Sequence, residues 1–340
     1  MFEDIISVEN LLVAWNEFLK GKRNKSDVQE FGLSLFDNIL LLHEELASGQ
    51  YMHGPYYRFT IADPKPRIIH KAEVRDRLVH HAIHRMLYPF FEKTFISDSF
   101  SCRKEKGTHR AMNRFRSFGY KISKNHTKTC WVLKCDIKKF FDSIDHEILL
   151  GILRSYTPDK ATMLLLGNII SSFSVIPGKG LPLGNLTSQL FANVYMNQFD
   201  QFMKHTLKAK YYIRYADDFT VLSDQIAPLE LLIPKIDGFL KTRLKLSLHP
   251  NKVSISTFAS GVDFLGWVHF PDHRVLRTAT KRRMMRRLRE HPTGETKRSY
   301  LGLLSHGNTT KIKKQFGQVL SKKPKSTIIE PNGINSTETG

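Results

Sequence analysis

Two adjacent carboxylates, Asp217 and Asp218, stand between two short apolar runs at residues 211–214 and 219–222. Bulky residues on both sides of a tight acidic turn predict a strand, a turn and a second strand. Neighbouring Asp side chains repel each other and contribute nothing to a hydrophobic core. A hairpin with this tip is therefore either a solvated surface turn or a site that binds a cation.

A second acidic position, Asp136, favours the cation site. It ends the apolar run at residues 130–135 and precedes a segment with helical character. A buried strand that ends in Asp places one carboxylate at the edge of a sheet. Together with Asp217 and Asp218 it could hold two divalent ions about 3.5–4 Å apart, the arrangement used for in-line phosphoryl transfer. Mg²⁺ prefers such oxygen ligands.

Length and charge narrow the class of protein. The 340 residues suffice for one large multi-lobed unit or for two to three subdomains. The net charge is +20, and residues 273–325 hold sixteen Lys and Arg against two Glu. Such a basic segment is either a solvated face or a binding surface for a polyanion, and nucleic acid is the favoured partner.

A membrane role is not expected, because no apolar run is long enough to span a bilayer. Three cysteines without a CxxC pair indicate a reducing compartment, and the N-terminus lacks the features of a signal peptide. We therefore expect a cytoplasmic protein. Periodicity predicts helices at 11–19 and 36–46, a hairpin of 56–61 with 67–70, and a helix at 72–88.

Seven motifs, taken in order from about residue 51 to residue 267, resemble those of the reverse transcriptases. They lie at residues 67–78 and 99–111 in the fingers, 134–146 around Asp136, 180–189, 215–218, 246–252 and 264–267. The resemblance implies an α+β right-hand polymerase with a mainly antiparallel palm sheet. The implied divisions are a helical N-terminal extension at 1–50, fingers at 51–128, palm at 129–270, a basic helical thumb at 271–321 and a disordered tail at 322–340.

The resemblance also implies the catalytic centre. Asp136, Asp217 and Asp218 would be the catalytic carboxylates of an RNA-directed DNA polymerase. The same three residues and the backbone of Ile137 would bind two Mg²⁺ ions, with Mn²⁺ as a substitute. Asp142 and Asp145 lie on the helix side of the motif and are expected to cap or pair at the surface.

Five residues are implied at the dNTP. Lys65 and Arg67 would grip the triphosphate, since a guanidinium offers two donors and an ammonium a compact charge. Phe141 would lie beneath the sugar and exclude a 2′-hydroxyl, while Phe140 would belong to the core. Gln189 and Lys252 complete the expected nucleotide site.

The template RNA and the RNA–DNA hybrid would be held by a second set of residues. Gly184 would let the backbone approach the nascent base pair. Thr187 or Ser188 could equally be the N-cap of the following helix. His80, His81 and His84 share a helix face, but no nearby Cys or acidic cluster completes a metal site, so a helix surface near RNA is preferred. The expected template and primer contacts are Arg103, Gly184, Ser188, Phe264, Leu265, Gly266, Arg282, Arg283, Arg286 and Arg287.

The segment from Leu183 to Gln189 is the sharpest discriminator within the family. Group II intron and retron enzymes usually carry a Gln before the glycine and end the motif with Ser-Pro, whereas here Leu183 and Ser188-Gln189 occupy these places. This pattern resembles the reverse transcriptases of diversity-generating retroelements. It implies a bacterial, archaeal or phage-encoded enzyme that copies a dedicated RNA into cDNA, with errors at template adenines.

That subfamily works with a small basic accessory protein and a structured non-coding RNA, which are therefore the expected partners. One departure is Ala216, where Met is also common; the carboxylates are unaffected. The alternatives are an antiphage-defence or retron-like reverse transcriptase with its own non-coding RNA, or a non-catalytic RNA-binding scaffold. The intact carboxylates argue against the scaffold.

Overall fold

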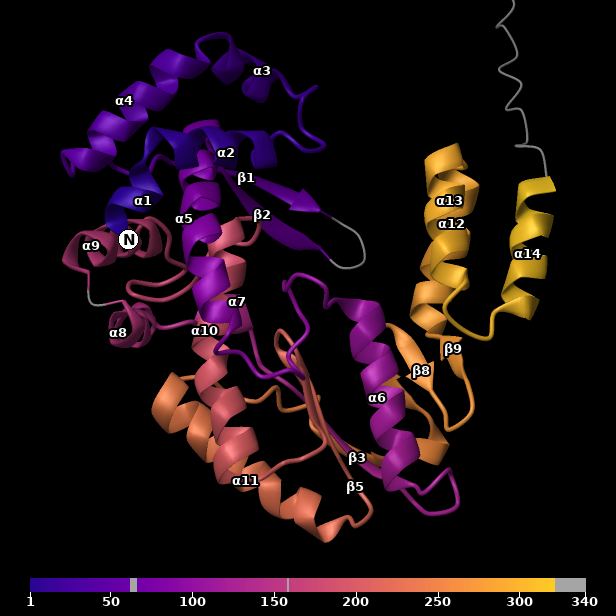
Figure 1. The fold of residues 1–340 in the computed structure, drawn as a ribbon. Coiled ribbons are helices and arrows are strands. Elements are labelled where there is room, and N and C mark those ends of the chain that lie inside the picture. Colours follow the sequence, from indigo (N-terminus) through magenta and orange to yellow (C-terminus); the bar gives the residue numbers. More distant parts are fainter. Residues whose placement is uncertain (62–65, 158, 322–340) are drawn as a thin grey trace, which may run out of the picture. The chain divides into compact units, whose positions relative to one another are not determined.

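The computed structural model describes residues 1–61, 66–157 and 159–321. The chain divides into two compact units (Figure 1). The first comprises Met1–Leu265 and His269–Asp272, and the second comprises Gly266–Val268 and the chain from His273 onward. The divisions expected within the first unit stay predictions, and the expected tail at 322–340 lies outside the described residues.

The chain begins with four helices, in agreement with the helical extension expected from the sequence. Ser7 caps the second of them by accepting a hydrogen bond from the amide of Asn10 at 3.2 Å. Leu11, Trp15 and Phe18 form its buried face, which packs against a fifth helix. The five are α1 (Phe2–Ile6), α2 (Val8–Phe18), α3 (Ser26–Leu33), α4 (Leu35–Ala47) and α5 (Val74–Glu92).

The predicted hairpin lies between α4 and α5 in sequence. Its strands β1 (Tyr56–Ile61) and β2 (Arg67–Ala72) are antiparallel, with Phe59 opposite Ile69. On β1 most side chains are exposed, so little apolar packing stabilises this strand of the hairpin.

A four-stranded antiparallel sheet forms the centre of the first unit and has the order β4-β5-β3-β6. This sheet and the surrounding helices confirm the predicted α+β class. The free side of β4 is covered by residues 98–100, because the Arg214 amide donates to the Asp98 carbonyl at 3.0 Å and the Phe100 amide donates to the Arg214 carbonyl at 3.0 Å. The strands are β3 (Trp131–Asp136), β4 (Tyr212–Tyr215), β5 (Asp218–Ser223) and β6 (Ser254–Thr257).

Helices cover both faces of this sheet, with α6 on one side and α10 and α11 on the other (Figure 1). The two-residue period of a strand explains this division. On β3, Val132 is buried with Phe115 of α6, whereas Leu133 is buried with Phe199 of α10. The helices of this part are α6 (Thr108–Ile122), α7 (Phe140–Ser143), α8 (His146–Tyr156), α9 (Lys160–Ser171), α10 (Leu186–Gln201), the π-helix η1 (Phe202–Thr206) and α11 (Ala227–Leu244).

Asp145 is a helix cap, as expected. Its carboxylate accepts from the amide of Ile148 at 3.2 Å and pairs with Lys245 at 2.8 Å. These partners hold the pKa of Asp145 below its usual range, although burial opposes the effect.

From residue 258 to residue 321 the chain forms short strands, one 3-10 helix and three α-helices. On α12, Met284 and Leu288 are buried, and the helix contacts α14 within the second unit. The predicted basic helix is confirmed as α12. In the described ranges, no helix is both long and apolar enough to cross a bilayer. The last elements are the 3-10 helix η2 (Phe258–Ser260), β7 (Val262–Phe264), β8 (Trp267–His269), β9 (Arg274–Leu276), α12 (Thr278–Glu290), α13 (Gly294–Leu304) and α14 (Thr310–Ser321).

Candidate active site

The turn between β4 and β5 carries the two adjacent carboxylates. Ala216 adopts a left-handed backbone with φ of +55°, and this closes the turn so that Tyr215 pairs with Asp218. On the other side of β5, Asp218 lies directly opposite Asp136 of β3. Residues directly opposite each other in an antiparallel pair project from the same face, so these two carboxylates are neighbours.

Backbone hydrogen bonds fix the three acidic positions. The amide of Ile137 donates to the carbonyl of Asp217 at 3.2 Å, and the amide of His249 donates to the carbonyl of Asp136 at 2.8 Å. The structure thus brings together the three carboxylates proposed from separate parts of the sequence. Their catalytic role, and metal binding by Ile137, stay predictions.

The carboxylates are difficult to ionise together. Burial raises the pKa of Asp217, and the nearby charge of Asp136 raises it further, while Lys252 and Arg67 oppose this rise. Burial raises the pKa of Asp218 to about 7, with Lys134 opposing the rise and Asp136 and Asp217 adding to it. A positive charge among these side chains would relieve the repulsion.

A divalent cation fits this donor set. The Oδ1 atom of Asp218 is buried and has no hydrogen-bond partner among the residues that the structure describes, so one hard oxygen atom is already desolvated. Over residues 1–61, 66–157 and 159–321, no three Asp, Glu, His or Cys side chains are grouped closely enough to hold an ion by themselves. Mg²⁺ usually takes only one or two carboxylates and fills its other positions with water and phosphate oxygens.

Two lysines flank the carboxylates. Lys252, expected at the nucleotide, has its Nζ 2.8 Å from Oδ1 of Asp136. Lys134 has its Nζ 3.5 Å from Oδ2 of Asp218 and also donates to the Asp263 carbonyl at 2.5 Å. Sequence reasoning did not single out Lys134. The signal was its place two residues before Asp136, which puts both side chains on one face of the strand.

Arg214 was also missed as a site residue, although a charged residue inside an apolar strand next to the acidic turn was a usable signal. Its guanidinium is buried and pairs with Asp200 at 2.6 Å, and it donates to the Ser99 hydroxyl at 3.1 Å. It also donates to the Ala216 carbonyl at 3.1 Å. Arg214 therefore supports the backbone of the left-handed residue that precedes the two carboxylates.

The expected nucleotide-binding residues are only partly described. Lys65 lies outside the described residues. Arg67 is exposed at the start of β2, and its positive charge opposes the rise in the pKa of Asp217. Phe140 is buried and Phe141 is half-buried, with ring centroids 5.3 Å apart and planes at 68°. One ring in the core and one nearer solvent is the arrangement that the sequence required; the sugar-selecting role of Phe141 stays a prediction.

The packing of the loop before α10 is enough to explain why residue 184 is a glycine. This residue has φ of +118°, and a Cβ atom would lie 2.9 Å from Cγ2 of Ile69 on β2. The amide of His70 also donates to the Leu183 carbonyl at 3.0 Å. Glycine is therefore required where β2 packs on the loop; its approach to a nascent base pair stays a prediction.

The first turn of α10 corrects one alternative. The helix begins at Leu186 after Asn185, so Thr187 and Ser188 lie inside the first turn and neither is the N-cap. Ser188 is 3% exposed and Gln189 is half-buried. Template contact by Ser188 and nucleotide contact by Gln189 stay predictions.

Two expected nucleic-acid residues have clear structural partners. Arg103 pairs with Glu92 at 2.6 Å and donates to two backbone carbonyls, with its side chain only 4% exposed. The ring of Phe264 is buried 5.0 Å from that of Phe115. Their contacts with template or primer stay predictions, as do those of the turn at Leu265 and Gly266, which have φ of +53° and +85°.

The arginines of α12 are in the second unit. Arg282, Arg286 and Arg287 are exposed, and Arg283 is half-buried. Arg286 lies 4.0 Å from Glu290 one turn later. Binding of duplex phosphates by these residues stays a prediction.

His80 of α5 is buried, so the expectation of a helix surface near RNA is wrong for this residue. This ring is 2% exposed and bonds to Thr187 and His53. Burial lowers the pKa of His80 to about 3, and it lowers those of the half-buried His81 and His84 to about 4. Neutral rings follow at physiological pH.

A family model described as "Reverse transcriptase (RNA-dependent DNA polymerase)" matches residues 62–269. The chain belongs to the reverse transcriptase family. This match spans the carboxylate hairpin, the strand of Asp136 and the loop before α10, and it confirms the class of enzyme that the ordered motifs predicted.

This chain matches its curated relatives over different shares of their length. Protein YkfC of Escherichia coli (strain K12) is 27% identical over 287 residues, which cover 72% of this chain and 73% of YkfC. The group II intron-encoded protein LtrA of Lactococcus lactis subsp. cremoris is 24% identical over 235 residues, covering 65% of this chain and 38% of LtrA. The chain thus spans well under half of LtrA.

Among solved structures, the chain is similar to telomerase from Candida albicans bound to a fragment of telomeric RNA, with a TM-score of 0.49 and 11% identity. That similarity covers 72% of this chain and 51% of the telomerase chain.

Proposed function

We propose that this reverse transcriptase copies an RNA template into cDNA by nucleotidyl transfer at Asp136, Asp217 and Asp218. The observation that carries the proposal is the cross-strand pairing of Asp136 with Asp218, together with the hydrogen bond that the Asp217 carbonyl accepts from the amide of Ile137, directly after β3. Three carboxylates with this mutual repulsion serve no purpose in a core and suit a site that binds divalent cations.

The side chains around the carboxylates have separate roles in this proposal. Two bound Mg²⁺ ions, or Mn²⁺ ions, would activate the primer 3′-hydroxyl and neutralise charge on the triphosphate. Lys252, beside Asp136, is close enough to the reaction centre to protonate or neutralise the departing pyrophosphate. Arg67 contributes a further positive charge, which favours the ionised form of Asp217.

Template-directed incorporation tests the proposal directly. The purified protein with Mg²⁺ and a primed RNA is expected to extend the primer with the dNTP that matches the template. A chelator should stop extension, and an unprimed RNA serves as the control. Absence of incorporation on every primed RNA, with the protein folded, would reject the polymerase function.

Phe141→Ala is expected to relax the choice of sugar. If the Phe141 ring lies beneath the sugar, its removal leaves space for a 2′-hydroxyl, and the preference for dNTPs over NTPs should fall by about 10- to 200-fold. Primer extension with each nucleotide type measures this ratio. Phe140→Leu, in the adjacent buried position, is the control and should keep the wild-type ratio. An unchanged preference for dNTPs over NTPs in Phe141→Ala would show that Phe141 does not select the sugar.

We further propose that the template is a dedicated RNA of a diversity-generating retroelement and that synthesis is error-prone at template adenines. The supporting observation is the string from Leu183 to Gln189. A small basic accessory protein and a structured non-coding RNA are the partners that this role requires. Sequencing of cDNA made on a defined RNA is expected to show errors concentrated opposite adenines; equal error rates at all four bases would contradict the subfamily.

A second candidate template follows from the relatives. LtrA is named a group II intron-encoded protein, so an intron RNA is the alternative to a retroelement RNA. Sequencing of the RNA that copurifies with the full chain separates the two, since a retroelement RNA lies beside a pair of DNA repeats that differ at adenine positions.

A further inference from the structure

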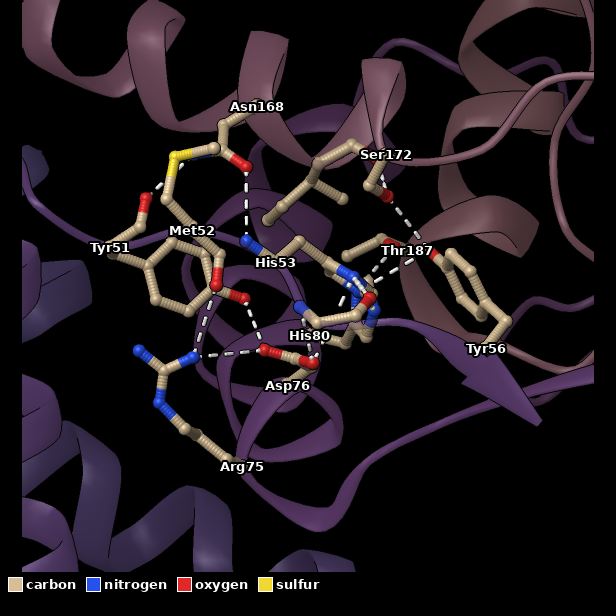
Figure 2. Close-up of polar contacts among 12 residues, drawn as sticks. Tyr51, Met52, His53, Tyr56, Arg75, Asp76, His80, Asn168, Ser172 and Thr187 are labelled. Carbon is tan, nitrogen blue, oxygen red and sulfur yellow. Dashed lines mark hydrogen bonds and ion pairs between the residues drawn. The ribbon is translucent and has the colours of Figure 1, made fainter.

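A chain of buried hydrogen bonds joins the first turn of α10 to the segment before β1 (Figure 2). Oγ1 of Thr187 lies 2.7 Å from Nδ1 of His80, and Nε2 of His80 lies 3.1 Å from Nε2 of His53. Nδ1 of His53 then lies 2.7 Å from the carbonyl oxygen of Gly54. Both rings are buried: His80 is 2% exposed, and the side chain of His53 is 0% exposed.

The chemistry of the partners fixes the direction of this chain when both rings are neutral. The Gly54 carbonyl can only accept, so His53 carries its proton on Nδ1 and accepts at Nε2. Nε2 of His53 also lies 3.2 Å from the Tyr56 hydroxyl. With that hydroxyl donating to Ser172, His80 donates to His53 from Nε2 and accepts at Nδ1. In this arrangement the hydroxyl of Thr187 is the donor at the start of the hydrogen-bond chain, and each ring has one tautomer.

Further polar contacts hold the same segment from its other sides (Figure 2). The hydroxyl of Tyr56 lies 2.9 Å from that of Ser172, at the end of α9. Asp76 of α5 accepts from the hydroxyl of Tyr51 at 2.8 Å and from the amide of Gly54 at 3.0 Å. The void beside Tyr56, His80 and Thr187 is too small for a water molecule, so protein atoms must satisfy these groups.

The contacts meet on the loop and helix that carry the predicted template and nucleotide residues. At one end, β2 bonds to the carbonyl of Leu183 and packs on Gly184. At the other end, His80 holds Thr187, which directly precedes Ser188 and Gln189 in the first turn of α10. Hydrogen bonds constrain direction as well as distance, whereas apolar packing alone allows a helix turn to rotate.

We propose that Thr187, His80 and His53 are positioning residues for RNA-templated synthesis, which fix the first turn of α10 relative to the β1–β2 hairpin. This inference rests on the proposed function. These residues act through Ser188 and Gln189 rather than on the carboxylates. Misplacement of the turn should therefore weaken nucleotide binding more than it slows the chemical step.

Thr187→Val tests this role, since it keeps the shape of the side chain and leaves Nδ1 of His80 without a donor. The KM for dNTP is expected to rise about tenfold, with kcat changed by less than about threefold. Thr187→Ser restores the hydroxyl and should restore KM. Thr162→Val is the matched control, because Thr162 is also fully buried in a helix and its hydroxyl bonds to Asp159 at 2.7 Å.

An unchanged KM in folded Thr187→Val, or an equal rise in Thr162→Val, would overturn the inference. A second measurement needs no variant: ¹⁵N NMR of the full chain should show the proton of His80 on Nε2 and that of His53 on Nδ1. A proton on Nδ1 of His80 would contradict the proposed chain. If the wild-type protein incorporates no dNTP, the proposed function fails. The NMR result still decides whether the hydrogen bonds from Thr187 through His80 to His53 exist.

Discussion

Asp218→Asn is expected to abolish dNTP incorporation and, at the same time, to make the metal-free protein more stable above pH 7. The loss of activity should be at least about 1,000-fold, because a catalytic metal contributes several kcal/mol of transition-state stabilisation and an amide is a poor ligand for it. The gain in stability follows from the burial that raises the pKa of Asp218 to about 7.

The sign of the pH effect follows from proton binding. The pKa of Asp218 is about 7 in the folded chain against an ordinary value of 3.8, so between these pH values the folded state binds more protons than the unfolded state. The free energy of unfolding therefore falls as pH rises from about 4 to about 7, by about 4 kcal/mol at most. The amide of the Asp218→Asn variant carries no charge, so this variant should lose the dependence.

Urea unfolding at pH 5 and pH 8 with a chelator measures the effect. The wild-type protein should lose stability between the two pH values, and Asp218→Asn should lose less. Addition of Mg²⁺ at pH 8 should stabilise the wild type, because the ion binds the folded state. Asp142→Asn, at an exposed position six residues after Asp136, should behave as wild type. A lower stability of Asp218→Asn at pH 8 without metal would contradict the repulsion.

Arg214→Met is expected to cost about 3–5 kcal/mol of unfolding free energy, the usual effect of removing one partner of a buried ion pair. Asp200 is 0% exposed and would be left with its charge uncompensated. The Ala216 carbonyl would also lose its donor, so the turn that presents Asp217 and Asp218 should loosen. Both urea unfolding and dNTP incorporation should therefore decrease.

A double variant separates the two effects. Arg214→Met combined with Asp200→Leu removes both charges and should recover much of the stability, since an apolar replacement of a buried pair is often neutral. Activity should stay low, because the carbonyl of Ala216 is still unsupported. Lys241→Met, which breaks the exposed pair with Asp237, is the control and should cost less than about 1 kcal/mol. A loss below that level in Arg214→Met would refute the supporting role.

The local patterns of the chain were enough to predict the elements that carry the carboxylates. The bulky residues on both sides of a tight acidic turn predicted the β4–β5 hairpin, and the apolar run before Asp136 predicted β3. The register between β3 and β5 could not be predicted, because the pairing of Asp136 with Asp218 joins segments that are far apart in sequence.

The same limit explains the residues that were missed or misjudged. For the histidines on α5 a helix surface was preferred because no nearby Cys or acidic cluster completes a metal site, and only the packing of α10 shows that His80 is buried against Thr187. Arg214 was one basic residue among many in a chain of net charge +20, and its partner Asp200 lies on a helix. The approach of Gly184 to a nascent base pair stays a prediction. Its packing on Ile69 could not be foreseen, because Ile69 belongs to a strand more than a hundred residues earlier.

The covering of β4 by residues 98–100 has a consequence for the protein in solution. An open strand edge presents unpaired amides and carbonyls to any other extended chain, and this is a common route to aggregation. Here both backbone groups of Arg214 are already bonded to Asp98 and Phe100. At Arg214, next to the turn that carries Asp217 and Asp218, the edge cannot recruit a foreign strand, so crowding by nascent or unfolded polypeptides should leave this corner of the enzyme intact.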